Sequence, residues 1–385
     1  MAASANLREN RKLYWLALTL TPGLGSTRCR QLVERLGGID NVFHASLTEL
    51  EATGIVAAAA QAIATGKSVA AAEEELLRAA GSGAEILTLD DDEYPSQLKE
   101  IYDPPAALFV RGDAAALSAP GIAVVGTRHP TPYGLGMAER LACDLAARGL
   151  IIFSGLARGV DAAAHRGCLA GKGRTVAVLG TGIDVVYPRE NQKLAGEILA
   201  QGGALVTEFA VGTFAAPQNF PIRNRIISGL ALGVLVIEAG EYSGTRITSR
   251  CALEQNRELF AVPGNVTNRS SWTPNTLIKQ GAKLTATWED VWEDLPASVR
   301  AALAPAAEAV AAGERPAPLF DDAGLPPHEK RIFGMLKADV PTHIDELVER
   351  LESEISSSEI FAALFELELA GKIRQLPGKN YVKAF

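Results

Sequence analysis

The sequence predicts an α/β protein with a Rossmann-like, doubly wound and mostly parallel sheet. From residue 84 to about residue 295, short apolar segments alternate with segments of helical pattern. These segments are almost entirely apolar, which is typical of strands buried on both faces of a parallel sheet. Several of them end in a glycine turn that leads into a helix, as in strand–helix–strand units.

The length and composition favour a soluble protein of two or three domains. The chain has 385 residues, of which 48% are hydrophobic and 21% charged, with a net charge of −8. An acidic chain binds nucleic acid only through a local basic patch. No apolar stretch is long enough to cross a membrane, so we expect a cytoplasmic protein with no membrane partner. Cys29, Cys143, Cys168 and Cys251 are far apart and predict neither a zinc site nor a disulfide framework.

Residues 1–83 have the pattern of a helical domain. Leu13, Leu16 and Leu20 fall on one face of a helix. The segment 21–26, Thr-Pro-Gly-Leu-Gly-Ser, resembles the hairpin of helix-hairpin-helix (SAM-like) modules, in which glycines let the backbone approach a DNA phosphate. A simple helix–helix turn with Ser26 or Thr27 as N-cap is the alternative, and both interpretations are open.

Residues 84–296 are expected to form the Rossmann-like domain. Its ligand should lie outside the carboxyl ends of the strands, as in other open α/β sheets. The eight expected strands are residues 85–89, 107–110, 122–125, 151–154, 175–179, 205–207, 234–237 and 259–262.

The remaining residues divide into a linker and a small C-terminal domain. Residues 297–325 are rich in Ala and Pro, which predicts a flexible linker with a short helix at its start. In residues 326–385, three helices (327–336, 344–351, 357–370) and a hairpin (372–376, 381–384) predict a winged helix. This domain has eight Lys or Arg against ten Asp or Glu, and three glutamates lie on its third helix. Such a helix repels phosphates, which favours a protein-interaction or regulatory role over duplex recognition.

Four strands are followed by turns that suit a phosphate, at residues 124–128, 154–161, 178–182 and 236–245. In the second turn, Ser154, Gly155 and Ala157 precede a helix, whose free N–H groups and dipole favour an anion. The competing and favoured interpretation is that Asp161 caps these N–H groups while His165 packs or bridges nearby. The last turn ends in Ser-Gly-Thr at residues 243–245 and opens another helix.

Arginines follow or adjoin these turns. Arg128 follows Gly126 and Thr127 at a strand end, and its planar guanidinium matches a phosphate bidentately. Arg223 and Arg225 flank Asn224 just before an apolar helix that is expected to begin at residue 226, which favours an anion site.

Phe220, in the same segment as these two arginines, offers a stacking face for a base or anchors the loop in the core, with equal weight. Arg174, on the flexible turn 171–174, precedes a strand and should face away from Arg128.

The chain lacks the common signatures of catalysis. It has no G-x-G-x-x-G opening a strand–helix unit, no P-loop and no G-x-S-x-G elbow. We therefore expect no catalytic residue, no cofactor and no metal, and a protein that is not an enzyme.

An ordered set of motifs resembles the bacterial DNA-processing protein A (DprA, also called Smf) family. The motifs extend over about 190 residues. They are Tyr-Pro at 94–95, Val-Gly-Thr-Arg at 125–128, Ser-Gly-Leu-Ala-Arg-Gly-Val-Asp at 154–161, Ala-Val-Leu-Gly-Thr-Gly-Ile-Asp at 177–184, Phe-Pro-Ile-Arg-Asn-Arg-Ile-Ile at 220–227, Ser-Gly-Thr at 243–245 and Ala-Val-Pro-Gly at 261–264.

The resemblance implies a protein that binds single-stranded DNA, protects incoming DNA and loads the RecA recombinase during natural transformation. It also implies a homodimer formed through the Rossmann-like domain, and a DNA pocket that uses Arg128 and Arg174. Many members have lysine in place of Arg174, and an apolar residue is common where this chain has Arg246. The full set of expected DNA- or phosphate-binding residues is Gly126, Thr127, Arg128, Ser154, Gly155, Ala157, Arg174, Phe220, Arg223, Asn224, Arg225, Ser243, Gly244 and Thr245.

Two alternatives belong to other functional classes. A nucleotide-cleaving enzyme similar to the phosphoribohydrolases would need a P-G-G-x-G-T-x-x-E motif. The corresponding segment here keeps Gly244 and Thr245 but has Thr248 in place of the glutamate. A nucleotide-sensing regulatory protein is the third interpretation, and titration with nucleotides against oligonucleotides would separate the three.

Overall fold

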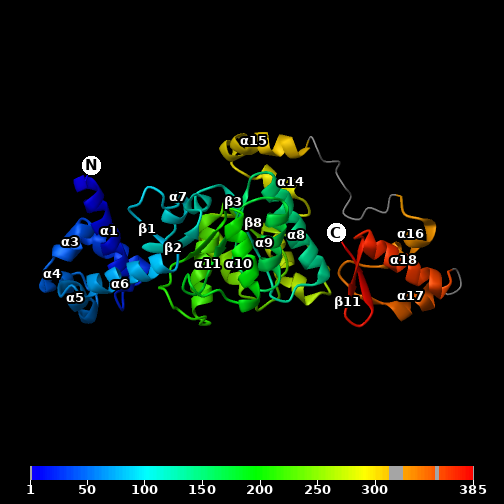
Figure 1. Cartoon of the computed structure of the whole chain (residues 1–385), viewed down its shortest axis with the longest axis horizontal. Helices are drawn as coiled ribbons and strands as arrows, with labels where there is room; N and C mark the ends of the chain where they lie inside the picture. The colour runs from blue at the N-terminus through cyan, green and yellow to red at the C-terminus, as the bar shows by residue number, and fades with distance from the viewer. Residues whose placement is uncertain (1, 312–323, 352–354, 385) are drawn as a thin grey trace.

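The computed structural model describes residues 2–311, 324–351 and 355–384 (Figure 1). Six helices form the N-terminal region, and they pack against the start of the central sheet. They are α1 (Ala2–Leu20), α2 (Ser26–Leu36), α3 (Ile39–His44), α4 (Leu47–Ala52), α5 (Ala57–Ala64) and α6 (Lys67–Gly81). Trp15 and Leu18 of α1 share one hydrophobic core with Leu87 and Leu108 of the sheet, which joins the helical region to the central domain.

A nine-stranded sheet forms the centre of the molecule, in the order β1-β2-β6-β5-β4-β3-β7-β8-β9. The strands are β1 (Glu85–Thr88), β2 (Ala107–Gly112), β3 (Gly121–Val125), β4 (Ile151–Ser154), β5 (Thr175–Val178), β6 (Ala204–Thr207), β7 (Gly233–Val236), β8 (Glu258–Ala261) and β9 (Lys283–Leu284). All eight predicted strands are present, and β9 was not predicted, because two residues carry no periodic signal.

The sheet is parallel from β6 to β9 and antiparallel where β1 pairs with β2 and β2 with β6. From β3 the chain adds β4, β5 and β6 on one side, and then returns to add β7, β8 and β9 on the other. The direction of winding therefore reverses between β3 and β7. The loops that follow these two strands diverge there, which is where ligands bind in open α/β sheets.

Helices cover both faces of the parallel part, so its strands are buried on both sides. In β3, Ile122 and Val124 pack into a core with α8 (Pro132–Ala147) and α9 (Val160–Ala170). Ala123 and Val125 face the other core, which includes α11 (Asn219–Leu230). The remaining helices of this domain are α7 (Ser96–Lys99), α10 (Gln192–Ala200), α12 (Thr245–Glu254), α13 (Trp272–Lys279) and α14 (Trp288–Glu293). Three short 3₁₀ helices, η1 (Ala114–Leu117), η2 (Arg189–Asn191) and η3 (Arg269–Ser271), complete it.

The first half of the expected linker is a helix. α15 spans Ala297–Ala311, and Val299 and Leu303 pack against the core that α8 and α9 cover. The high alanine content that indicated a linker also favours a helix, and the two apolar side chains fix it to the domain. Residues 312–323 of the expected linker lie outside the described part of the chain.

The C-terminal residues form a small domain with its own core. It consists of α16 (Pro327–Met335), β10 (Thr342–His343), α17 (Ile344–Leu351), α18 (Ser357–Leu369), β11 (Ile373–Leu376) and β12 (Asn380–Lys383). The three strands pair in the order β10-β12-β11. This is the predicted winged helix with one additional short strand.

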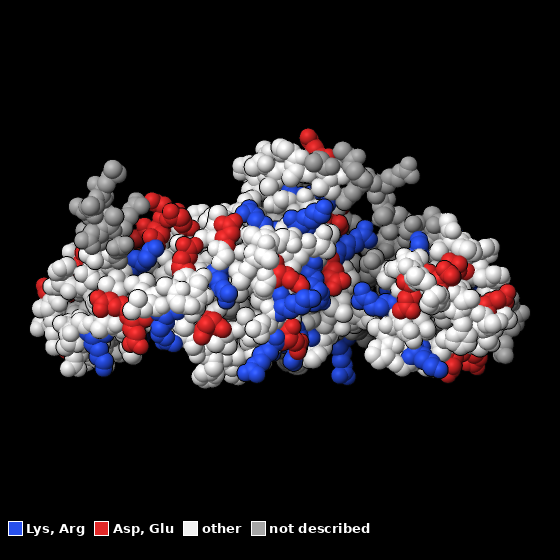
Figure 2. All heavy atoms as spheres, in the orientation of Figure 1, with Lys and Arg blue, Asp and Glu red and all other residues white. Residues whose placement is uncertain are grey.

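Charges of both signs are interspersed over the face of the molecule shown in Figure 2, and no continuous basic surface covers it. A site for a polyanion on this face must therefore be local. Within the described ranges, no helix is both long and apolar enough to span a bilayer.

Candidate functional site

A cavity of about 1020 Å³ lies where the loops after β3 and β7 diverge. Its walls come from these loops, from the start of α9, from α11 and from the η3–α13 segment. Ten of the predicted site residues line it: Gly126, Thr127, Arg128, Ala157, Phe220, Arg223, Asn224, Ser243, Gly244 and Thr245.

Arg128 is an exposed cation of this cavity. Its Cζ atom lies 5.5 Å from the centroid of the Phe220 ring. No carboxylate pairs with Arg128 among the residues that the structure describes. The guanidinium is therefore held over an aromatic face with its donors free, which is the state required of an anion ligand.

The Phe220 ring is half-buried, packs against the chain beneath it and lines the cavity. It packs over Gly180, where a Cβ atom would lie 2.8 Å from its Cδ1 atom, so only glycine fits beneath the ring. The ring centroid also lies 5.7 Å from that of Tyr187, with an interplanar angle of 40°. Phe220 thus anchors its helix and still lines the cavity.

Asp161 and Arg223 form the buried floor of the cavity. Arg223 is 4% exposed and donates from Nη1 to the carbonyl oxygens of Gly155 (2.8 Å) and Val178. Burial raises the pKa of Asp161, although Arg223, nearby backbone N–H groups and Arg128 all oppose this shift. Two guanidiniums face one carboxyl group, so at least one positive charge stays uncompensated at the floor.

The turn after β4 is not a phosphate cradle. Asp161 accepts the N–H of Gly155 at 3.1 Å, and the hydroxyl of Ser154 is buried and donates to the carbonyl of Val124 at 2.6 Å. The interpretation favoured for Asp161, that it caps this turn, is correct, and Ser154 and the Gly155 N–H are removed from the candidate site. His165 does not pair with Asp161, because its Nδ1 lies 2.7 Å from the Thr175 hydroxyl.

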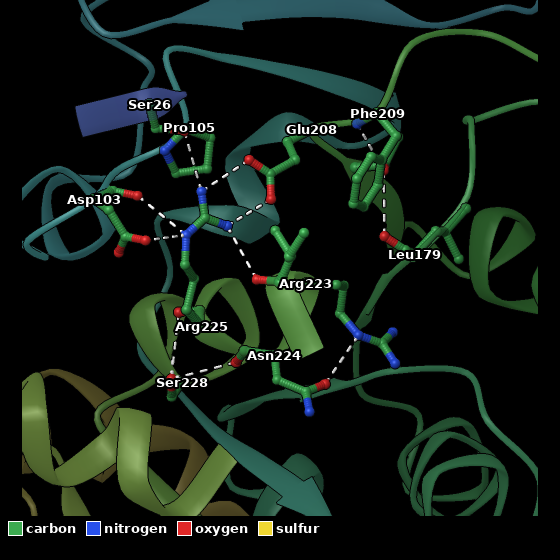
Figure 3. A network of polar contacts seen from close by, with 12 residues as sticks. Ser26, Asp103, Pro105, Leu179, Glu208, Phe209, Arg223, Asn224, Arg225 and Ser228 are labelled. Carbon is green, nitrogen blue, oxygen red and sulfur yellow. Dashed lines mark hydrogen bonds and ion pairs between the residues drawn. The ribbon is translucent and has the colours of Figure 1, made fainter. Parts of the chain in front are cut away.

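Arg223 and Arg225 point in opposite directions because they lie on one helix (Figure 3). α11 begins at Asn219 and not near residue 226, since a proline is tolerated in a first helical turn. Residues two apart on a helix do not face each other. Arg225 is bound away from the cavity by Glu208 (2.5 and 2.8 Å) and Asp103 (2.8 Å), so the structure does not bring it into the candidate site.

Arg225 also contacts the N-terminal helices. Its Nη2 atom lies 3.3 Å from the hydroxyl of Ser26, the first residue of α2. Gly25 is the N-cap of that helix, so neither Ser26 nor Thr27 has the capping role that the turn interpretation assigned. Ser26 and Arg225 both line a second cavity of about 560 Å³ that also contains Asp103 and Glu208.

Arg174 does not share the cavity of Arg128. It precedes β5 at the amino edge of the sheet and pairs with Asp113 at 2.9 Å, whereas Arg128 follows β3 at the carboxyl edge. The pocket that the resemblance implied for these two residues is therefore not formed within one chain.

Several lining residues were not predicted. Among them are Tyr187, Tyr242, Arg269 and Trp272. Tyr242 is 92% exposed and Trp272 39% exposed, although large aromatic side chains are usually buried. Each is a single residue on a loop or at a helix start, so no periodic pattern marks it in the sequence.

The fold and the cavity define a Rossmann-like protein with an arginine- and aromatic-lined cleft at the switch point of its sheet and a C-terminal winged helix. The family model described as DNA recombination-mediator protein A matches residues 85–296, and the model of the DprA winged helix domain matches residues 314–379. The chain belongs to this DprA/Smf family.

Similar proteins extend over most of the chain. Protein Smf of Escherichia coli (strain K12) is 43% identical over 302 residues, which is 77% of both chains. Protein Smf of Synechocystis sp. is 30% identical over 97% of this chain and 99% of its own. The X-ray structure of DNA processing protein A (DprA) from Streptococcus pneumoniae has a TM-score of 0.65 and 33% identity, and covers 74% of this chain and 98% of that one.

Proposed function

We propose that this protein binds single-stranded DNA in the cavity at the switch point, without catalysis. The observation that carries the proposal is Arg128, an exposed guanidinium that has no carboxylate partner in the described part of the chain and lies 5.5 Å from the Phe220 ring. A phosphate and a neighbouring base need such a pair, a free cation beside an aromatic face.

The shape of the cavity favours a single strand over a duplex. Phe220 is half-buried within a recess, and Tyr187 lies beside it. Only an unstacked base reaches such a surface, because the bases of a duplex are already stacked on each other. Recognition through stacking and phosphate contacts predicts little dependence on sequence.

The charge of the floor suits a phosphodiester. Arg128 and Arg223 outnumber Asp161, and Arg223 is held in place by two carbonyl oxygens. A phosphodiester brings a single negative charge that matches the one left uncompensated. The remaining surface stays anionic overall, which limits binding elsewhere.

Fluorescence anisotropy with labelled single- and double-stranded oligonucleotides at several salt concentrations tests the proposal. We expect tighter binding of the single strand, and the Arg128→Gln variant should lower the slope of log affinity against log salt by about 0.7, one phosphate contact. Arg166→Gln is the matched control, because Arg166 pairs with Glu139 at 3.4 Å and does not line the cavity. Equal binding by native protein and Arg128→Gln would refute the proposal.

We extend the proposal to the partners implied by the family resemblance. A bound strand with accessible bases can be transferred to a recombinase, so the protein would protect incoming DNA and load RecA in the cytoplasm, as a homodimer through the Rossmann-like domain. RecA ATPase activity on DNA already covered by a single-strand binding protein measures this step. Stimulation by native protein but not by Arg128→Gln is expected, and no stimulation by native protein would contradict the extension.

The nucleotide-cleaving alternative has less support. Thr248 occupies the position of the glutamate in the phosphoribohydrolase motif, and its side chain is buried at 2% exposure. A threonine hydroxyl cannot replace a carboxylate that acts on the substrate. Incubation with nucleoside monophosphates should therefore release no free base.

A further inference from the structure

A second arginine lies over an aromatic ring that lines the cavity. Arg246 lies in the first turn of α12, which follows β7, and its Cζ atom lies 5.5 Å from the ring centroid of Trp272. Trp272 is the first residue of α13, which follows β8, and Arg269 lies in the η3 turn just before it. Trp272 and Arg269 both line the cavity. We call Arg246, Arg269 and Trp272 the Trp272 group, and Arg128, Tyr187 and Phe220 the Arg128 group.

The two groups lie on opposite sides of the switch point. The Arg128 group comes from the β3 end, the η2 loop and α11, whereas the Trp272 group follows β7 and β8. The cavity that joins them, about 1020 Å³, is at the upper end of the 300–1,000 Å³ range of small-molecule pockets. One nucleotide bound at the Arg128 group therefore leaves the part of the cavity beside the Trp272 group unoccupied.

The cations of the Trp272 group are free to bind an anion. No carboxylate partner of Arg246 or Arg269 occurs in the described ranges, although Arg246 donates to the carbonyl oxygen of Glu241 at 2.9 Å. By contrast Arg250, one turn further along α12, pairs with Glu254 at 2.8 Å. The carbonyl contact fixes the guanidinium over the ring while its other donors stay available.

Packing against the core does not explain why Trp272 is a large aromatic residue. It is 39% exposed, whereas its neighbours Ser271 and Thr273 are buried. A partly exposed tryptophan that lines a cleft beside a guanidinium offers a base a stacking surface.

We propose that the Trp272 group is a second nucleotide subsite, in which Trp272 stacks on a base and Arg246 and Arg269 bind the adjoining phosphate. The ligand is single-stranded DNA that already occupies the Arg128 group, so the inference rests on the proposed function. The strand crosses the switch point from the β3 end to the β8 end.

The fluorescence of Trp272 tests the contact directly. Unlabelled oligothymidine should quench part of the tryptophan emission of the full-length protein, because a stacked base quenches an indole. The variant Trp272→Phe should lose that quenching, because phenylalanine has no indole to be quenched. Quenching that persists in Trp272→Phe would overturn the proposal.

Affinity as a function of oligomer length tests the subsite separately. With oligothymidines from the dinucleotide upwards, Trp272→Leu should leave the shortest ligand unaffected and weaken longer ones by about 5- to 150-fold, the effect of one stacked base. Arg246→Gln should lower the salt slope for long oligomers by about 0.7, and Arg250→Gln is the matched control. If circular dichroism shows that Trp272→Leu is misfolded, the salt slope of Arg246→Gln and the quenching of Trp272→Phe test the subsite instead.

The possible failures are distinguishable. If Arg128→Gln weakens binding at every length while Trp272→Leu and Arg246→Gln bind long oligomers as the native protein does, the subsite is wrong and the proposed function stands. If Arg128→Gln also has no effect, both are wrong.

Discussion

Arg225→Met should destabilise the protein without changing the DNA affinity of the folded molecule. Arg225 is the second arginine of the Arg-Asn-Arg segment, and by sequence alone it is as good a DNA ligand as Arg223. In the structure it joins α11 to Glu208, Asp103 and Ser26 (Figure 3). Burial lowers the pKa of Arg225, but Glu208 and Asp103 outweigh burial and raise it overall.

The magnitude follows from burial. The Arg225 side chain is 9% exposed and that of Glu208 12%, so removal of the cation leaves a buried carboxylate without its partner. Such a loss costs about 3–5 kcal/mol. Asp103 is 38% exposed, and solvent screens its ion pair with Arg225. The expected magnitude therefore includes only the loss of the pair with Glu208.

Urea denaturation followed by circular dichroism measures the effect. With a slope of about 3 kcal/mol per molar urea, the midpoint should fall by roughly 1 M or more. The double variant Arg225→Met with Glu208→Leu should recover most of the loss, because two apolar side chains replace the pair. A stable Arg225→Met variant with weakened DNA binding would refute the reasoning and return Arg225 to the DNA site.

Two further predictions concern the buried groups beneath the cavity. Gly155→Ala should lower the free energy of unfolding by about 1–3 kcal/mol in urea titrations, because the new Cβ atom would lie 2.6 Å from Cζ of Arg223; unchanged stability would show that the guanidinium moves freely. Burial lowers the pKa of His165 to about 3. The unfolded chain therefore takes up a proton on His165 near pH 6.5, whereas the folded chain does not. The free energy of unfolding is consequently highest above pH 6.5 and decreases as the pH falls towards 3. His165→Gln keeps a polar partner for Thr175 and should flatten this slope, which is at most about 1.4 kcal/mol per pH unit; an unchanged slope in pH-dependent unfolding would contradict the assignment.

Local patterns explain what could be predicted. Each strand of the central sheet is a short apolar run beside a turn, and Arg128 follows such a strand directly, so its place at the carboxyl edge follows from the pattern of parallel sheets. The predicted placement of Arg225 failed because the start of α11 was placed too late in the sequence. Taking α11 to begin near residue 226 treated Arg223 and Arg225 as neighbours in a loop, whereas a helix from Asn219 sends them to opposite sides.

The sequence by itself determined the order of the elements, the doubly wound sheet, the winged helix and the resemblance to the DprA/Smf family, because these depend on residues close in the chain. Only the tertiary structure decided which groups are free. Asp161 occupies the turn after β4, Glu208 neutralises Arg225, and Trp272 contacts Arg246 from another loop. The physical reason is that hydrogen bonds, ion pairs and ring contacts between distant segments depend on how the sheet brings the loops together, which no local pattern encodes.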